Sequence, residues 1–270
     1  MAIRFFGPSG GSARGFDADV LLWKVAVEAN GGSVSLARLI IVDQFVFSEK
    51  ASGTWALTDD YWGFWAENAI QALTSLKQLR LATAVNAPTF TADRGYVFDG
   101  TTNYLDTGFI PSTHAVAMTG TDMRAGAYER ANLNTSTYAL GTLDNANQNL
   151  RIIPRDTSDR MSANINSASV ILASSITDSR GFIAASRTAA AVFEAWLNGV
   201  STGTGTPGTT GTALPTRSIF IGANNNAGTP TTFRAASMGF VAVGSSLSAA
   251  QELAQYNAIQ AWATAVEAQV

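Results

Sequence analysis

The chain contains no cysteine and only one histidine, His114, among its 270 residues. Without cysteine there can be no disulfide, no cysteine-ligated metal and no thiol nucleophile. A single histidine also excludes a metal site with two histidine ligands, and we expect neither a metal ion nor a cofactor. His114 follows Pro111 at a predicted strand start, and we interpret it as a surface or loop residue because no nucleophile or orienting carboxylate is paired with it.

Charged residues are also scarce, at 14% of the chain, and the formal net charge is −3. Because there is no basic excess to neutralise phosphates, nucleic-acid binding is disfavoured. No apolar run approaches the ~18 residues that indicate a membrane-spanning helix. The N-terminal residues lack the apolar core of a signal peptide. We therefore expect a protein made in the cytoplasm, without signal-peptide export and without membrane insertion.

Residues 16–90 show the periodicity of helices. Apolar residues recur at helical spacing in residues 17–29, in a segment that begins at Ser33 or Ser35, and in residues 67–79. The same region contains a cluster of aromatic residues, which are Trp55, Tyr61, Trp62, Phe64 and Trp65. We interpret this cluster as core, because large aromatic side chains gain much free energy on burial; an exposed stacking platform is the alternative.

After residue 90, short apolar runs separated by Gly, Asn, Thr and Pro indicate strands. In residues 193–197, apolar side chains alternate up to Asn198-Gly199, the preferred dipeptide of a two-residue hairpin turn. Residues 201–213 form a Gly/Thr tract that we predict to be a long exposed loop. A final helix is predicted to follow Leu247 and Ser248.

These patterns predict a mainly β fold with three parts. Residues 1–15 are a flexible arm rich in Gly and Ser, residues 16–90 are a helical N-terminal region, and residues 91–270 are a β-sandwich that ends with a C-terminal helix.

A β-sandwich of this kind can carry two kinds of chemical site, a glycoside hydrolase site and a glycan-binding site. Glycoside hydrolysis needs two carboxyl groups on either side of a cleft, and the clearest strand offers only Glu194. Glycan binding needs amide and carboxylate groups beside an aromatic ring. The candidates for glycan binding lie in two Asn-rich segments and are Asp144, Asn145, Asn147, Asn149, Asn224, Asn225 and Asn226. The same residue types also favour turns, so turn formation is the alternative reading of both segments.

Three parts of the sequence resemble one known family when taken together. Residues 96–109 are similar to an F-D-G-x-x-x-Y-L-D-T strand pair, residues 196–199 to a Y-L-N-G hairpin, and residues 238–244 with 247–253 to a last strand and an L-S-x-x-E helix. The family is the concanavalin A/laminin G-like jelly roll carried by phage and prophage virion proteins. The resemblance implies a jelly-roll sandwich over residues 91–270.

The resemblance also implies a function. It indicates a component of a virion, such as a spike, a fibre or a decoration protein, made in the bacterial cytoplasm and assembled with other virion proteins. By analogy we expect a homo-oligomer, with a trimer as the first guess. Jelly rolls of this family often bind glycans, so we expect attachment to host cell-surface polysaccharide. Enzymatic members carry an acidic E-x-D-x-x-E strand that this sequence lacks, so we expect a protein that is not an enzyme. The alternatives are a purely architectural capsid or tail protein and a glycan hydrolase.

Overall fold

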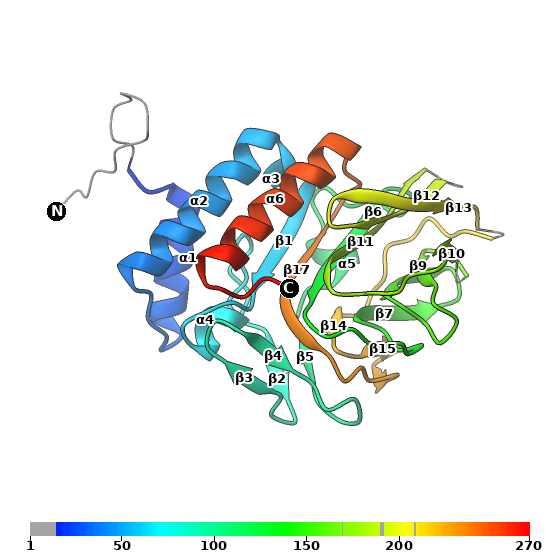
Figure 1. The fold of residues 1–270 in the computed structure, drawn as a ribbon, viewed down its shortest axis with the longest axis horizontal. Coiled ribbons are helices and arrows are strands. Elements are labelled where there is room, and N and C mark those ends of the chain that lie inside the picture. Colours follow the sequence, from blue (N-terminus) through cyan, green and yellow to red (C-terminus); the bar gives the residue numbers. More distant parts are fainter. Residues whose placement is uncertain (1–14, 169, 190–191, 208) are drawn as a thin grey trace.

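The computed structural model describes residues 15–168, 170–189, 192–207 and 209–270. Within these described residues, the strands form two sheets that face each other, and helices precede and follow them (Figure 1). This arrangement confirms the predicted fold class, a mainly β sandwich with an N-terminal helical segment and a C-terminal helix. The predicted flexible arm, residues 1–15, lies outside the described residues except for Gly15.

The helices are α1 (Ala18–Ala29), α2 (Leu36–Ser52), α3 (Thr54–Leu57), α4 (Ala69–Leu73), α5 (Pro111–His114) and α6 (Ala249–Ala265). Three of them begin where the sequence indicates. Asp17 and Ser35 are the N-caps of α1 and α2, and Ser248 forms a capping box with Gln251 at the start of α6.

The first sheet has eight strands among the described residues and is called here the eight-stranded sheet. In spatial order they are β13 (Val200–Gly205), β12 (Val192–Leu197), β11 (Gly181–Ala189), β6 (Met123–Glu129), β17 (Ser237–Gly244), β4 (Gly95–Val97) and β3 (Thr89–Thr91), with β1 (Thr58–Gly63) also paired to β17. The predicted hairpin is confirmed: Asn198 and Gly199 join β12 to β13 with φ of +53° and +76°, as a type I′ turn requires.

The second sheet has nine strands among the described residues and is called here the nine-stranded sheet. Its main path runs through β10 (Val170–Ala173), β9 (Met161–Ile165), β8 (Gln148–Ile153), β7 (Leu140–Asn145), β14 (Phe220–Ile221), β5 (Tyr104–Asp106) and β2 (Thr83–Val85), and β15 (Asn224–Asn226) and β16 (Thr229–Thr231) branch from β7. The pairing of β15 with β7 is parallel, and the other pairs are antiparallel.

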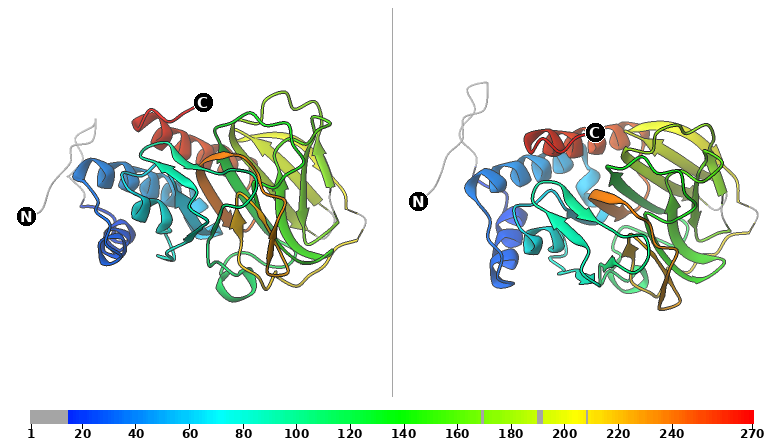
Figure 2. Two further views of the ribbon diagram at one scale, coloured as in Figure 1. Left: turned by 90° about the horizontal axis from the view of Figure 1, so that it is seen from below. Right: turned by 60° about the horizontal axis from the view of Figure 1, so that its bottom comes forward.

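Helices α2 and α6 cover the outer face of the eight-stranded sheet. They lie side by side, and the views of Figure 1 and Figure 2 agree that α1 to α4 and α6 gather on one side of the molecule while β7 to β13 lie on the other. Phe45 of α2 and Trp262 of α6 both contact the ring of Phe240 in β17, at centroid distances of 5.3 and 5.8 Å. A second core therefore lies between the helices and the sheet, in addition to the core between the two sheets.

The aromatic cluster of residues 55–65 supplies both cores. Side chains of an extended chain alternate between its two faces, so Trp62 and Phe64 pack between the sheets while Tyr61 and Trp65 pack against the helices. All four of these side chains, Tyr61, Trp62, Phe64 and Trp65, are fully buried, with 0% exposure. The interpretation of this cluster as core is correct.

Strands also occur where the sequence predicts only helices. Two of them, β1 and β2, fall within residues 16–90, β3 begins there and ends at Thr91, and β1 pairs with β17 from Thr58 to Gly63. The region predicted as helical therefore contains strands as well as the helices α1 to α4. Both sheets include strands from both sides of residue 90.

Two further local predictions need correction. The helix predicted over residues 67–79 is the shorter α4, which ends at Leu73. Beyond it the backbone N–H of Leu76 donates to Tyr61 O in β1 at 2.9 Å and not to a carbonyl of the preceding helical turn. The Gly/Thr tract that was predicted to be a loop begins as strand β13. Glycine suits that strand because a Cβ at Gly203 would lie 2.0 Å from Leu172 O in β10.

Candidate functional site

The first predicted segment, around the turn from β7 to β8, uses its polar groups internally. The carboxylate of Asp144 accepts hydrogen bonds from the backbone N–H and the hydroxyl of Thr216, at 2.5 and 2.8 Å. Asn145 accepts from the backbone N–H of Asn147 at 3.0 Å. Asn149 is fully buried, and its amide donates to Ala146 O at 2.8 Å. These contacts are those of a turn that is fixed by its own side chains.

The second predicted segment is strand β15, and the structure places it beside the first segment. Asn225 is the register partner of Thr142, and Asn226 of Leu143. Asn225 is nevertheless buried: its amide donates to Ser218 O at 2.9 Å and accepts from Gly228 N at 2.8 Å. The structure buries Asn149, Asn224 and Asn225, while Asn145 and Asn226 are exposed. Of the three buried asparagines, Asn224 keeps a side-chain oxygen without a partner among the described residues.

A different polar group occupies the outer face of the nine-stranded sheet. In β8, Leu150 and Ile152 point between the sheets, so Arg151 between them lies on the outer face. Its guanidinium carbon lies 4.8 Å from the ring centre of Tyr138, which is cation–π distance. Burial lowers the pKa of Arg151, and among the described residues no carboxylate forms an ion pair with it.

Two asparagines and a glycine adjoin Arg151 on this sheet. Arg151 is the register partner of Asn164 in β9 and of Gly141 in β7. A Cβ at Gly141 would lie 2.8 Å from Asn224 Oδ1 and 3.2 Å from Arg151 Cγ. The missing side chain of Gly141 therefore allows Asn224 and Arg151 to approach each other. We call Tyr138, Gly141, Arg151, Asn164 and Asn224 the Arg151 face.

The Arg151 face contains three buried polar atoms without a hydrogen-bond partner among the described residues. They are Arg151 Nε, Asn164 Oδ1 and Asn224 Oδ1. Most buried polar groups in proteins are paired, so three unpaired ones on one face make this face a candidate site. A guanidinium, amide oxygens and an aromatic ring are also the groups that bind sugars. The sequence offered one signal, a lone arginine within the apolar strand of residues 150–153, which the prediction did not use.

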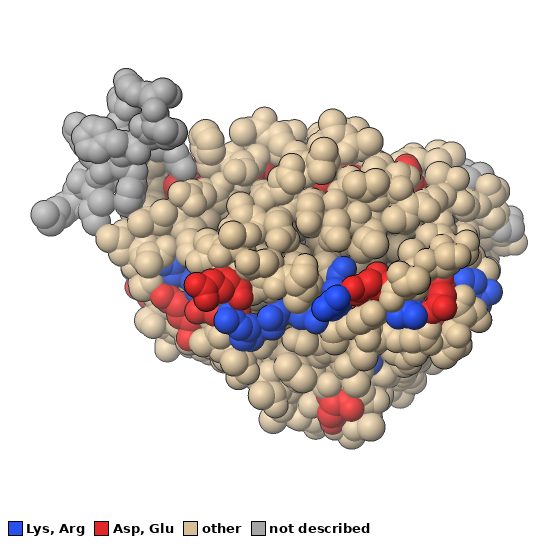
Figure 3. Space-filling model, viewed as in Figure 1, with Lys and Arg blue, Asp and Glu red and all other residues tan. Residues whose placement is uncertain are grey.

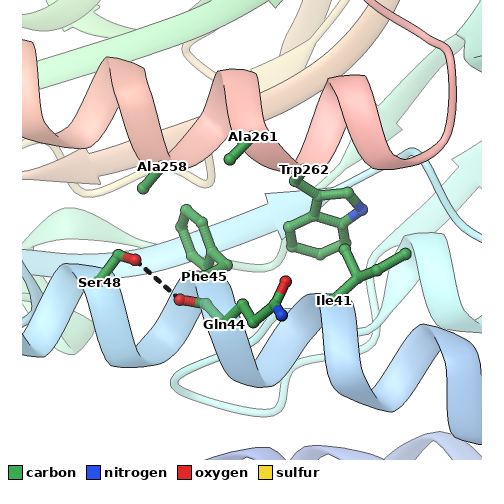
Figure 4. A pocket seen from close by; sticks show the side chains of 7 residues that line it. All are labelled: Ile41, Gln44, Phe45, Ser48, Ala258, Ala261 and Trp262. Atoms are coloured by element: carbon green, nitrogen blue, oxygen red, sulfur yellow. Dashed lines mark hydrogen bonds between the residues drawn. The ribbon is translucent and has the colours of Figure 1, made fainter. Parts of the chain in front are cut away.

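One hollow of the described surface is too small for a sugar. One cavity, of about 40 Å³, lies between α2 and α6 and is drawn in Figure 4. Its lining residues are Ile41, Gln44, Phe45, Ser48, Ala258, Ala261 and Trp262. This volume suits a water molecule and excludes a sugar ring. It is therefore a packing defect between two helices and not a binding pocket.

A larger hollow, of about 520 Å³, lies between the turn that joins β3 to β4 and the end of α6. Arg94 in this turn donates to Val266 O at 3.0 Å, so its guanidinium holds the end of α6 in place. On the face seen in Figure 3, few charged side chains lie over α2 and α6, and both signs alternate along the band below them. This face presents no extended basic patch.

The buried acids are held by internal partners. Glu49 accepts hydrogen bonds from Thr54, Tyr61 and Gln255, and burial raises its pKa. Asp59 accepts from three backbone N–H groups, those of residues 116, 117 and 118. These carboxylates join α2, β1, α6 and the chain after α5, which is a structural role.

Other sequence predictions concern metals, membranes and His114. No group of three or more potential metal ligands occurs among the described residues. No helix in the described ranges is long and apolar enough to span a membrane. His114 ends the short helix α5, so the predicted strand start at this position is wrong. Its Nδ1 accepts from Ile110 N at 2.8 Å, and burial lowers its pKa.

Comparisons with known proteins identify the fold and not a family. No protein-family model and no curated protein matches the sequence. Among solved structures, the chain is similar to Trypanosoma rangeli sialidase in complex with the inhibitor DANA, with a TM-score of 0.51, 11% identity and coverage of 82% of this chain and 39% of the sialidase. The same sialidase in complex with 2,3-difluorosialic acid matches with a TM-score of 0.50, 12% identity and coverage of 82% and 39%. Domain 4 of AbnA, an extracellular arabinanase from Geobacillus stearothermophilus, in complex with arabinotriose, matches at a TM-score of 0.49 and 11% identity, over 74% of this chain and 98% of the domain.

These similarities correct one prediction from the sequence. The expectation that the protein is not an enzyme is contradicted, because the chains with which it shares its fold are those of an enzyme, a sialidase. That expectation rested on the missing acidic strand motif. Catalytic carboxyl groups need to face each other in space, and they can come from separate elements, so one absent motif does not decide the question. The chain spans 39% of the length of these sialidase chains.

Proposed function

We propose that the protein binds a glycan on the Arg151 face. The observation that carries the proposal is the half-buried guanidinium of Arg151, which stacks on Tyr138 and has no carboxylate partner among the described residues. Asn164 and Asn224 place unpaired amide oxygens beside it. A sugar ring can stack on the tyrosine while its hydroxyl groups satisfy these atoms.

The fold is consistent with this role, since the sialidase chains that share it were solved in complex with the inhibitor DANA and with 2,3-difluorosialic acid. The support for a virion component on a phage particle is the sequence resemblance of residues 96–109, 196–199, 238–244 and 247–253. Under this proposal the glycan is host surface polysaccharide. Display of many copies, with a trimer as the predicted unit, raises avidity without tight individual sites.

The test is a glycan array probed with the protein in a multivalent form. We expect Arg151→Gln and Tyr138→Ala to weaken binding about tenfold to hundredfold, because each removes an interaction worth about 1.5–3 kcal/mol. Arg217→Gln is the matched control, since Arg217 is an exposed arginine beside the same sheet. Asn145→Ala and Asn226→Ala test the originally predicted segments, and we expect little effect from them.

Two results would refute the proposal. One is the absence of binding to any glycan even in the multivalent form. The other is binding by Arg151→Gln and Tyr138→Ala at the wild-type level. The bound polysaccharide is also analysed for new reducing ends, which report hydrolysis.

A further inference from the structure

The arginines of this protein differ in how their charge is compensated. Arg124 and Arg234 are fully buried and form ion pairs with Glu252 and Glu129, at 2.6 and 2.9 Å. Arg38 is buried and pairs with Asp93. Removing a charge from water costs several kcal/mol unless an opposite charge is near, and these pairs meet that requirement inside the fold.

Arg151 is desolvated without such a partner. Burial lowers its pKa, Tyr138 opposes this shift in part, and no carboxylate among the described residues forms an ion pair with it. The tyrosine ring at 4.8 Å holds one face of the guanidinium. A planar guanidinium binds carboxylates through two parallel hydrogen bonds at its edge. A carboxylate from outside the protein would therefore supply the charge that the fold omits.

The asparagines narrow the choice of ligand further. The unpaired atoms of Asn164 and Asn224 are the oxygens Oδ1, which only accept hydrogen bonds. They lie next to Arg151, through register pairing and across Gly141 respectively. A ligand that satisfies the whole face must carry a negative charge for Arg151 and hydrogen-bond donors for the amide oxygens. Fully ionised sulfate has only acceptors, whereas a sugar acid has both a carboxylate and hydroxyl groups.

We propose that the Arg151 face recognises a carboxylate-bearing sugar within an acidic polysaccharide, with the carboxylate on Arg151 and sugar hydroxyl groups on Asn164 and Asn224. This inference rests on the proposed glycan-binding function and specifies its ligand class. Arg151 is the residue that determines specificity for acid over neutral sugars. Gly141 is a positioning residue, because a Cβ there would contact both Asn224 and Arg151.

The experiment uses three carboxylated polysaccharides, polygalacturonate, hyaluronan and polysialic acid, each compared with its own carboxyl-reduced form. Binding to the full chain is measured by affinity electrophoresis and calorimetry. We expect at least one acidic polymer to bind, and its carboxyl-reduced form to bind at least tenfold more weakly. Dextran sulfate offers negative charge and hydroxyl groups but no carboxylate, so it tests whether the anion must be a carboxylate, and it is expected to bind as weakly as the reduced form.

Two variants separate the charge from the geometry of Arg151. Arg151→Gln is expected to reduce binding of the acidic polymer to the level of its reduced form. Arg151→Lys keeps the charge but loses the planar fork, and it is expected to lose most of the preference for carboxylate over sulfate. Urea unfolding of both variants tests whether the fold is intact. We expect it to be intact, because Arg151 forms no ion pair with a described residue.

The possible failures are distinguishable. Equal binding of an acidic polymer and its reduced form, with both weakened by Arg151→Gln, would overturn the carboxylate inference and leave glycan binding intact. Equal binding of dextran sulfate would replace carboxylate specificity by general anion binding and so overturn the inference as well. If none of the carboxylated polymers binds, the inference is wrong, and the glycan array then decides the proposed function separately.

Discussion

The ion pair between Arg124 in β6 and Glu252 in α6 allows a quantitative test of how the last helix is held to the sheet. Arg124 Nε and Nη2 donate to the two carboxylate oxygens of Glu252 at 2.7 and 2.6 Å, and both side chains are 1% exposed. Replacing Arg124 by Met leaves Glu252 buried without a counter-charge. Breaking a buried pair in this way costs about 3–5 kcal/mol. We expect Arg124→Met to lower the free energy of unfolding by that amount.

The assay is urea unfolding followed by tryptophan fluorescence. With a urea slope of about 3 kcal/mol per M, the midpoint should fall by about 1 M or more. The double variant Arg124→Met, Glu252→Leu removes both charges and should lie within about 1 kcal/mol of wild type, since apolar replacements of buried pairs are often neutral. The exposed pair of Arg180 and Asp178 is the control, and Arg180→Met should cost less than about 1 kcal/mol. The reasoning is refuted if Arg124→Met behaves like Arg180→Met, or if the double variant is less stable than the single one.

Three further predictions concern stability. Burial raises the pKa of Asp60 from 3.8 to about 6, so its contribution to stability is fully present below pH 3.8 and is lost as the pH rises through 6. Asp60→Asn should remove about 3 kcal/mol of this pH dependence in urea titrations at pH 4 and pH 7, and an unchanged pH profile would contradict the assignment. A Cβ at Gly239 would lie 2.3 Å from the ring of Trp65; Gly239→Ala should therefore cost about 1–3 kcal/mol in thermal unfolding, and a neutral effect would show that the ring can move. Ser248→Ala removes the N-cap of α6 and should cost about 1 kcal/mol, whereas Ser248→Asp should retain most of the stability.

Local signals in the sequence predicted the elements that depend on local interactions. The starts of α1, α2 and α6 are fixed by a capping side chain within a few residues, at Asp17, Ser35 and Ser248. The hairpin at Asn198-Gly199 is likewise fixed by the φ angles that its two residues adopt. Such features can be read from a short window because their partners lie inside it.

The features that the sequence did not reveal depend on distant partners. Strand β1 exists because it pairs with β17, and β13 tolerates its glycines because β10 lies against them. Leu76 is not helical because its backbone N–H donates to Tyr61 O in β1. Each of these pairings is decided by tertiary packing, which overrides local propensity.

The candidate site shows the same limit. The Asn-rich segments were visible in the sequence, but Asn149 in β8 and Asn225 in β15 are buried, and their amides donate to the backbone carbonyls of residues 167 and 218, which a short window does not contain. Arg151 was visible as a charge in an apolar strand. Its lack of an acid partner could be established only when the residues on the adjacent strands were known.

The position of β17 has a consequence for synthesis on the ribosome. Glu49 and Gln255, which join α2 to α6, are 206 positions apart, and β1 must likewise wait for a partner that emerges near the end of translation. At ~5–20 residues per second, the nascent chain keeps that edge and the apolar surface of α2 uncovered for about 10–40 s. During this time a chaperone can bind the uncovered strand edge and apolar surface. Slower elongation would lengthen the exposure and so favour association between neighbouring nascent chains.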